Sequence, residues 1–438
     1  MLAIATIRLD DRSARRYSFV LTGRPLRVAD PGDGAWRALA GAMAEGRTIV
    51  AIPRHTREDA TPTAALVCRP ARAMVPGIGA LDERPLDADQ SNTSVVLGER
   101  VLLKAFRRLQ PGLNPELELT AYLSEEAGFP AIPPLAGFAE VVSIRHGTET
   151  IALAQSFVTE GSDAYEWLAE ALTARILGPA DPGSGDATDV AADPGSEDPT
   201  DVAADLGTLT AGLHAALARA HGIPDLEPRD ASRTEMRAWG RTARAGLARA
   251  VELVSGDAAA VLRDLAPGIV EAFGAFEASA SVPLLTRIHA DYHLGQVLIA
   301  PDGYRIVDFE GDPLRTIEER RALDSPLRDV ASMLRSLDHV GRSAGRRAEI
   351  RKDGPVQSPG LDLAAWLARS RERFLHAYAT SLGASGAPIA VDPILLRAFE
   401  IDKECREFIY AATYLPTWLW APTEGMRGLF EADRGAPP

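Results

Sequence analysis

A short polar block flanked by apolar segments constrains this chain more than any other stretch. Residues 289–296 read HADYHLGQ, and residues 308–310 read DFE. An apolar run before the first stretch predicts a buried strand. Two more apolar runs lie around a Pro-Asp-Gly turn between the stretches and predict a hairpin. Four polar groups therefore surround a predicted hairpin: Asp291, Gln296, Asp308 and Glu310.

Groups of this kind suit phosphoryl transfer. That reaction needs a base that orients a hydroxyl group and oxygen ligands that hold Mg²⁺ on the phosphates. A purely structural interpretation, in which His289 and Asp291 brace a turn, accounts for one acid but not for the whole set. The block therefore favours phosphoryl transfer.

The block resembles the His-x-Asp-x4-Asn and Asp-Phe-Gly signature of the protein-kinase-like and aminoglycoside-phosphotransferase-like enzymes. Gln296 stands at the Asn position and Glu310 at the Gly position. Within that superfamily, the sequence is similar to the actinobacterial maltokinase-like sugar kinases. The resemblance implies an α+β, bilobal, protein-kinase-like fold with a β-rich N-terminal cap and a mostly α-helical C-lobe. It also implies Asp291 as catalytic base and ATP and Mg²⁺ as cofactors.

The resemblance further assigns the remaining residues of the block. Gln296 and Asp308 are expected to hold Mg²⁺, with Glu310 as a further metal contact. His293, together with Asp291, is expected to contact the substrate. No covalent enzyme intermediate is required, because catalysis of this kind rests on positioning and charge stabilisation.

A second part of the nucleotide site is predicted near residue 100. The polar loop DQSNTS (89–94) precedes two apolar strands, and Lys104 ends the second of them. An ammonium on an apolar strand needs a partner, and only three of the 47 basic residues are lysines. The resemblance implies phosphate contacts from the loop and a pairing of Lys104 with Glu116 on the next helix, in preference to Glu118. The expected loop residues are Ser91, Asn92, Thr93 and Ser94.

An apolar strand at 151–158 is expected to run between the lobes. Its backbone would meet the adenine edge at Gln155, Phe157 and Val158. Helical patterns follow from residue 206, and His214 on the first of them reads as a structural histidine. Asp329 and Arg335 lie on a predicted helix that resembles a family segment supporting the catalytic loop. Residues 341–360, with five basic residues, are expected to form an exposed loop.

Composition limits the partners and the compartment. The chain has 438 residues, 46% of them apolar, and a formal net charge of −14, which argues against nucleic acid as a partner. The two cysteines indicate neither a disulfide framework nor a zinc site, and no apolar stretch suggests a signal peptide or membrane span. We expect a cytoplasmic protein that acts on a small-molecule sugar.

The chain divides into three expected parts. Residues 1–85 alternate β-patterned runs with turns and read as an α+β cap. Residues 86–158 read as the kinase N-lobe, and residues 159–438 as the helical C-lobe. Within the last part, a twelve-residue acidic stretch at 181–192 recurs at 193–204 with ten identical positions, which predicts a duplicated surface loop.

The C-terminal helices bear on the substrate. Maltokinases carry smaller or different residues where this chain has Glu404, Tyr414 and Trp420. Larger aromatic rings would narrow a disaccharide site, and a new carboxylate at Glu404 could pair with an amine. This pattern favours a monosaccharide kinase that prefers glucosamine, as in the glucosamine kinase branch of the family. Phosphorylation at O6 follows by analogy with other monosaccharide kinases. The alternatives are a maltokinase that makes maltose 1-phosphate, an aminoglycoside phosphotransferase, and a non-catalytic sugar-binding module.

Overall fold

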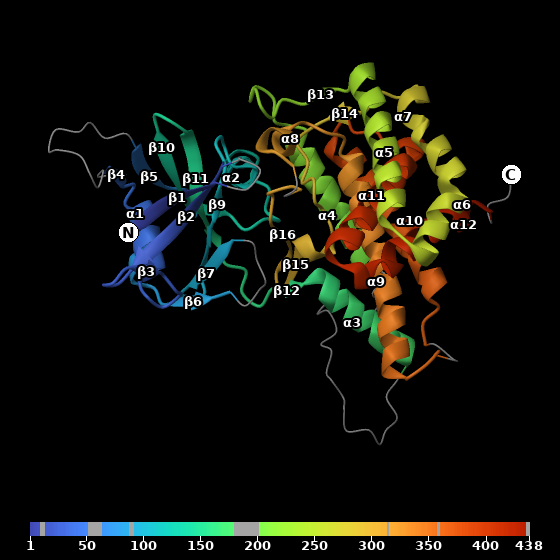
Figure 1. The fold of residues 1–438 in the computed structure, drawn as a ribbon, viewed down its shortest axis with the longest axis horizontal. Helices are drawn as coiled ribbons and strands as arrows, with labels where there is room; N and C mark the ends of the chain where they lie inside the picture. The colour runs from blue at the N-terminus through green and yellow to red at the C-terminus, as the bar shows by residue number, and fades with distance from the viewer. Residues whose placement is uncertain are drawn as a thin grey trace. The chain divides into compact units, whose positions relative to one another are not determined.

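The computed structural model describes residues 1–8, 14–50, 64–86, 92–178, 201–312, 315–356 and 360–434. The chain forms two compact units (Figure 1). Unit 1 comprises Met1–Gly161 and Asp302–Arg321, and unit 2 comprises Ser162–Pro301 and Ala322–Pro438. Most of the described strands lie in unit 1 and nearly all the long helices in unit 2, which confirms the predicted fold class.

Unit 1 is built on a seven-stranded sheet, counted over its described residues. The strand order is β4-β5-β10-β11-β8-β7-β6. The strands are β4 (Thr48–Val50), β5 (Ala64–Pro70), β6 (Glu83–Pro85), β7 (Thr93–Leu97), β8 (Val101–Ala105), β10 (Leu135–Ser143) and β11 (Gly147–Ser156). Because β5 pairs with β10 along its length, the expected boundary between cap and N-lobe at residue 85 falls inside a continuous sheet.

A smaller sheet and one long helix complete the N-terminal part of unit 1. The sheet contains β1 (Leu2–Arg8), β2 (Ala14–Thr22), β3 (Arg27–Val28) and β9 (Arg108–Leu109). Helix α1 (Ala35–Ala44) contributes Trp36, Ala40 and Met43 to a core that also contains Leu103 and Ile151. The alternation of strands and turns expected for this region, with an α+β character, is confirmed over its described residues.

The side-chain alternation of β8 places the strand lysine. Val101, Leu103 and Ala105 are buried in the core described above, whereas Leu102 and Lys104 are only partly buried. Successive side chains of a strand point to opposite faces. Lys104 therefore lies on the face of the sheet that is turned away from this core.

The following helix carries the predicted glutamate. Helix α2 (Pro115–Ala121) begins with Pro115 in its first turn, and the Asn114 side chain accepts hydrogen bonds from the backbone N–H groups of Glu116 (2.8 Å) and Leu117 (3.2 Å). Proline at this position and asparagine as N-cap are standard helix-start chemistry. Unit 1 ends with β16 (Gly303–Ile306) and the short helix α8 (Ile317–Arg321).

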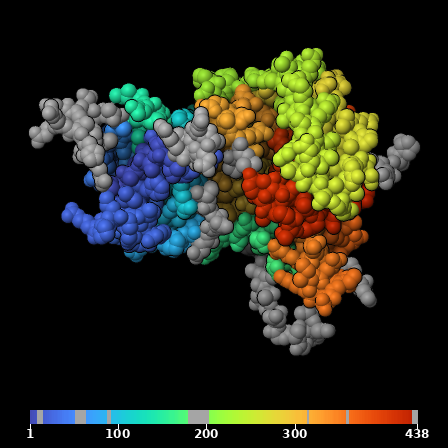
Figure 2. All heavy atoms as spheres, in the orientation of Figure 1, coloured from blue at the N-terminus to red at the C-terminus, as the bar shows by residue number. Residues whose placement is uncertain are grey.

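Unit 2 is mostly helical. Its helices are α3 (Ala164–Leu177), α4 (Asp201–Leu217), α5 (Arg233–Leu253), α6 (Gly256–Phe273), α7 (Ala275–Ala278), α9 (Leu327–Arg351), α10 (Leu363–Ser385), α11 (Pro393–Tyr414) and α12 (Trp420–Arg434). Helix α9 packs against α3, α10 and α11, and α4 packs against α10. Figure 2 shows the C-terminal helices, in red, at the surface of this unit beside α5 and α6, in yellow-green.

Short strand pairs join the ends of these helices. Strand β12 (Ser162–Asp163) pairs with β15 (Val297–Ala300), and β13 (Arg229–Asp230) pairs with β14 (Leu284–Leu285). The strand expected at 284–288 is therefore limited to its first two residues. The polar stretch 289–296, called the catalytic block from here on, follows it as an irregular segment that ends in the 3-10 turn Leu294–Gln296.

Three further expectations about unit 2 differ in part from the structure. The exposed loop expected at 341–360 was wrong in its first half, because α9 continues to Arg351 and buries Ser343, Ala344 and Ala348. Asp201–Ala204, the last residues of the duplicated stretch, begin α4 rather than a loop. The rest of that stretch lies outside the described residues. The C-lobe expected at 159–438 includes Asp302–Arg321, which the structure groups with unit 1.

Among the described residues, no helix combines the length and the apolar character needed to cross a bilayer.

Candidate active site

Lys104 is the centre of a charged cluster in unit 1. Its ammonium nitrogen lies 2.8 Å from Glu116 Oε2, 2.6 Å from Asp308 Oδ1 and 2.6 Å from Glu310 Oε1. We call these four residues the Lys104 cluster. The structure thus pairs Lys104 with Glu116, as expected, and adds both acids of the Asp-Phe-Glu segment. Three carboxylates meet at one ammonium, and Asp308 lies 204 residues from Lys104 in the sequence.

The backbone around Asp308 has an unusual conformation. Asp308 has φ 64°, in the left-handed region, and Gly311 has φ 70°. A left-handed residue other than glycine costs about 1–2 kcal/mol. In this conformation the carboxylate of Asp308 points at the ammonium of Lys104. The ion pair that results helps to offset the cost.

The charges of the cluster are unequal, and this imbalance shifts pKa values. Burial alone would lower the pKa of Lys104, but the three carboxylates raise it well above its ordinary value. Burial, with help from Asp308 and Glu310, raises the pKa of Glu116 to about 8 against the opposing effect of Lys104. Three carboxylates around one ammonium leave an excess of negative charge. The cluster is therefore suited to gain a further cation or to keep a proton.

The same acids satisfy the requirements of a divalent cation. One oxygen from each of Glu116, Asp308 and Glu310 lies within 4.8 Å of the other two. Mg²⁺ and Ca²⁺ prefer carboxylate and amide oxygens. The donor set and its excess charge fit the metal that was expected at Asp308 and Glu310.

The predicted phosphate loop is only partly described. Ser91 lies outside the described residues. The Asn92 side-chain amide donates a 2.7 Å hydrogen bond to Glu310 Oε1, which joins it to the Lys104 cluster. Thr93 and Ser94 were expected in the loop but belong to β7, where Ser94 pairs with Lys104 across the hairpin. The hydroxyl of Thr93 accepts a 2.9 Å hydrogen bond from Arg107 Nε.

The expected adenine-contact segment ends β11. The side chain of Gln155 is buried, and its amide lies 3.4 Å from the hydroxyl of Thr120 in α2. Phe157 and Val158 are partly buried beyond the strand, and the Arg84 guanidinium lies 5.3 Å from the centre of the Phe157 ring. Their expected contact with adenine through the backbone stays a prediction.

In unit 2, Asp329 of α9 holds the catalytic block in place. Its carboxylate accepts hydrogen bonds from the backbone N–H groups of His289 (2.7 Å) and Ala290 (3.0 Å). Ala290 has φ 68°, so the chain turns through a strained conformation just before Asp291. The expected supporting role of Asp329 is confirmed by these contacts. Arg335, expected to act with it, contacts Glu400 and Glu404 instead.

Two further helices support the same block. His214 of α4 is fully buried between Asp329 (3.4 Å) and the Tyr378 hydroxyl of α10 (2.8 Å), which confirms it as a structural histidine. The hydroxyl of Thr210 donates to the Tyr292 hydroxyl at 3.1 Å. The backbone N–H of Leu294 donates to Ser336 Oγ of α9 at 3.0 Å. Helices α4, α9 and α10 thus fix the backbone on both sides of Asp291.

Asp291 itself is partly exposed and lies in a charged environment. Its Oδ2 lies 4.0 Å from His293 Nε2. His293 Nδ1 accepts a 3.1 Å hydrogen bond from the Gly295 N–H, so in the neutral ring Nε2 carries the proton and faces the carboxylate. Burial lowers the pKa of His293 despite the opposing charge of Asp291, which keeps the ring neutral near pH 7.

Lys403 of α11 is a residue near the catalytic block that sequence reasoning left out of the site. Its ammonium lies 2.8 Å from Glu407 Oε1. Burial would lower its pKa, but Glu407 and then Asp291 raise it above the ordinary value. The scarcity of lysine in this chain was the signal that could have identified it, because all but three basic residues are arginine.

Gln296 closes the catalytic block. Its backbone N–H donates to the His293 carbonyl at 2.9 Å, and its side chain is partly buried. Gln296 therefore belongs to unit 2, with Asp291 and His293, whereas Asp308 and Glu310 belong to unit 1. The amide remains a predicted metal ligand.

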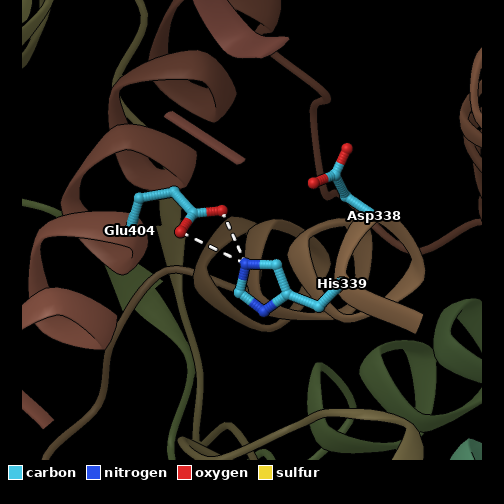
Figure 3. Close-up of side chains that lie close together, drawn as sticks. All are labelled: Asp338, His339 and Glu404. Carbon is cyan, nitrogen blue, oxygen red and sulfur yellow. Dashed lines mark hydrogen bonds and ion pairs between the residues drawn. The ribbon is translucent and has the colours of Figure 1, made fainter. Parts of the chain in front are cut away.

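Glu404 does not occupy the position that was expected for it. The residue is fully buried, and Oε1 lies 3.0 Å from His339 Nε2 and 3.4 Å from Arg335 Nη1. Figure 3 shows both Glu404 oxygens directed at the imidazole of His339. The expectation of a carboxylate free to bind a substrate amine is corrected: the buried side chains of His339 and Arg335 already hold it.

In the same region, side-chain atoms of Asp338, His339 and Glu404 lie as close together as the ligands of a metal ion. Asp338 is already neutralised by Arg342, at 2.7 and 3.1 Å. Arg335 lies 3.4 Å from Glu404 and 3.7 Å from Asp338. With two arginines supplying the positive charge, these groups form an ion-pair network between α9 and α11 and have no need of a metal ion.

The aromatic residues expected at the sugar site lie at the end of α11 and the start of α12. Tyr414 is exposed, and its ring centre lies 5.3 Å from that of Tyr410. Trp420 is partly buried 5.1 Å from Trp418, and the Arg346 guanidinium lies 5.0 Å from its ring centre. Tyr414 and Trp420 thus keep partly accessible rings, and their contact with a sugar stays a prediction.

Comparison with known proteins places the chain in a family. The profile described as "Phosphotransferase enzyme family" matches residues 82–367. The chain belongs to this family. It is 31% identical to a glucosamine kinase of Streptacidiphilus jiangxiensis over 427 residues, which cover 96% of this chain and 86% of the relative. A glucosamine kinase of Mycolicibacterium smegmatis is 27% identical over 405 residues, which cover 92% of this chain and 90% of the relative.

A solved structure gives the same result for the fold. A glucosamine kinase in complex with glucosamine, ADP and inorganic phosphate is 27% identical and superimposes with a TM-score of 0.72. The match covers 98% of this chain and 90% of that protein. The expected membership of the aminoglycoside-phosphotransferase-like sugar kinases is thereby confirmed. The chain is a phosphotransferase.

Proposed function

We propose that this protein is an ATP-dependent kinase that phosphorylates glucosamine and forms glucosamine 6-phosphate. The observation that carries the proposal is the 31% identity to a glucosamine kinase over 96% of this chain. Two features of the molecule support it: the Lys104 cluster in unit 1 and the supported Asp291 in unit 2.

In the proposed reaction, Asp291 accepts the proton of the sugar hydroxyl as the γ-phosphoryl group leaves ATP. Its partial exposure and the neutral His293 beside it suit this role, because the carboxylate remains available as an acceptor. Lys104, oriented by Glu116, binds the phosphates. Asp308, Glu310 and Gln296 would hold Mg²⁺. The chemistry that this ion supplies when bound is neutralisation of charge on the phosphates.

The proposal for the sugar site is narrower than the sequence suggested. Tyr414 and Trp420 are proposed to pack against the apolar face of the sugar. Glu404 is no longer part of the site, since its carboxylate is held by His339 and Arg335.

The test is ADP release with ATP and Mg²⁺ in the presence of glucosamine, glucose, N-acetylglucosamine, maltose or kanamycin. The expected result is turnover with glucosamine well above that with the other acceptors. NMR of the product should show phosphorus coupled to the protons on C6. A preference for maltose or kanamycin would replace the proposal with a maltokinase or an aminoglycoside phosphotransferase. Nucleotide binding without turnover on any acceptor would indicate a sugar-binding module.

A further inference from the structure

Helix α8 follows the Asp-Phe-Glu segment and ends in two arginines, Arg320 and Arg321. Neither takes part in the proposed chemistry. Both side chains nevertheless contact other segments of unit 1 close to the Lys104 cluster. These contacts bear on how the residues of the Lys104 cluster are held together.

Arg320 connects the Asp-Phe-Glu segment to the loop before α2. The arginine is buried, and its Nη1 donates a 3.1 Å hydrogen bond to the backbone carbonyl of Glu310. The same nitrogen lies 3.9 Å from Glu310 Oε2, and Nη2 donates to Gln110 Oε1. Arg320 therefore restrains the backbone of Glu310 while the Glu310 side chain faces Lys104 and Asn92.

Arg321 connects α8 to α2. Its Nε and Nη2 donate to the two oxygens of Glu118 at 3.0 and 2.7 Å, which is a bidentate pair. Glu118 is two residues from Glu116, and residues with this spacing point to different sides of a helix. Helix α2 is therefore held on one side by Lys104 through Glu116 and on another by Arg321 through Glu118.

The electrostatics of the cluster explain why such restraint is needed. Oxygens of three carboxylates lie within 4.8 Å of one another around a single ammonium. Like charges at this distance repel each other. Glu116 belongs to α2 and Glu310 to the segment before α8, so ionisation of both acids, the state that binds a metal ion, pushes these two segments apart. The two arginines join the same segments at other points.

We propose that Arg320 and Arg321 are positioning residues that hold α2 and the Asp-Phe-Glu segment in register, so that the Lys104 cluster is assembled before a metal–nucleotide complex binds. The inference rests on the proposed function only for the assumption that this cluster binds the metal–nucleotide complex. Neither arginine needs to touch the substrate.

The test measures binding of Mn²⁺ with ADP by EPR titration, so its outcome does not depend on the sugar. Arg321→Met, Glu118→Met and the double variant form a double-mutant cycle. Each single variant should weaken binding by about 10-fold, and the double variant should be no weaker than the singles, because coupling of this size is typical of contacting charged pairs. Exchanging the charges, with Arg321→Glu and Glu118→Arg together, should restore part of the affinity.

The chain offers a matched control pair. Arg27 and Asp33 form an exposed bidentate pair in the N-terminal part of the same unit, at 2.7 and 2.6 Å. Arg27→Met should leave the affinity for Mn²⁺ with ADP unchanged. For Arg320, Lys keeps a positive charge and Met does not, so Arg320→Lys should bind more tightly than Arg320→Met.

The proposal is overturned if the variants bind Mn²⁺ with ADP like the wild type, or if affinity falls only in step with thermal stability. Additive losses in the cycle would also overturn the pairing of Arg321 with Glu118. If Arg320→Met does not fold, Arg320→Lys and the Glu118 variants still decide the question. Failure of the proposed function would look different: tight binding of Mn²⁺ with ADP, but no phosphorylation of glucosamine.

Discussion

The Oδ2 atom of Asp329 accepts a 2.7 Å hydrogen bond from the backbone N–H of His289. Oδ1 accepts a second one from Ala290, whose φ of 68° is strained. One carboxylate on α9 therefore determines the path of the chain two residues before the proposed base. The geometry of Asp291 depends on this side chain as much as on the catalytic block itself.

We expect Asp329→Asn to lower kcat far more than it raises KM for either substrate. The amide can accept only one of the two backbone N–H groups, and a buried hydrogen bond to a charged group contributes about 1.5–3 kcal/mol. Steady-state kinetics with a thermal melt would measure both effects. Asp392→Asn, which changes a cap on α11, controls for a general loss of stability. If this control lowers kcat to the same extent at equal Tm, the specific role of Asp329 would be wrong.

Asp291→Asn should reduce kcat by about 10²–10⁴-fold, because that is the range for the loss of a general base. Nucleotide binding should persist, since Lys104 and its partners are unchanged. The matched control is Asp302→Asn, an exposed carboxylate in the neighbouring turn paired with Arg305. Calorimetry with ADP and a turnover assay separate the two properties. Retained turnover in Asp291→Asn would require another base.

Gly425→Ala should destabilise the protein by about 1–3 kcal/mol through overpacking. A methyl group there would lie 2.5 Å from Glu404 Oε1 and 3.2 Å from His339 Nε2. Gly246→Ala on α5 is the matched control, because its methyl group would meet nothing within 4 Å. That substitution should stabilise by about 0.5–1 kcal/mol. Urea denaturation measures both changes, and equal effects would contradict the close approach of α12.

The His339–Glu404 pair predicts a specific pH dependence of stability. Burial would lower the pKa of His339, but the charge and hydrogen bond of Glu404 raise it above the ordinary value. A raised pKa in the folded state stabilises fully below the unfolded value of about 6.5 and is lost as the pH rises through the folded value. The Tm difference between wild type and His339→Gln should therefore be largest at acidic pH and shrink at alkaline pH.

The matched substitution for this comparison is His376→Gln, at an exposed position of α10. Its Tm difference from the wild type should be small throughout. A Tm difference for His339→Gln that grows toward alkaline pH would show that folding lowers the pKa of His339 instead of raising it.

Glu404→Gln should lower stability by about 3 kcal/mol, because removing one charge of a buried pair leaves the other uncompensated. The preference for glucosamine over glucose should not change, since the carboxylate is fully buried against His339 and Arg335. Competition between the two sugars, measured alongside a melt, tests both parts. A selective loss of glucosamine turnover would restore the amine-binding role that the sequence suggested.

Sequence reasoning predicted the parts of the site that depend on local chemistry. The pairing of Lys104 with Glu116 was implied by the family resemblance, and a lone lysine on a strand with an acid in the first turn of the next helix agreed with it. The supporting role of Asp329 was implied by the resemblance of its helix to a family segment. The fold class was implied by the same resemblance.

The errors arose where tertiary contacts decide the outcome. Glu404 shares a helix face with charged residues, and nothing in the sequence shows that His339 and Arg335 of α9 meet it in the interior. The glycines and arginines at 341–351 suggest a loop, but packing of Ser343 and Ala344 keeps them helical. Sequence reasoning did not single out Arg320 and Arg321, because their partners Gln110 and Glu118 are about 200 residues away.

Glu404 contacts His339 in the interior and leaves no room for a side chain at Gly425. This packing has an evolutionary consequence. These three positions constrain one another and should covary: a relative with a small apolar residue in place of Glu404 should lose the basic residue at 339 and tolerate side chains at 425. Under the proposed contact of Tyr414 with the sugar, drift in acceptor preference should instead be concentrated at exposed positions such as this one, where a change requires no compensation. A branch of the family can therefore change its sugar without altering the interior of its helices.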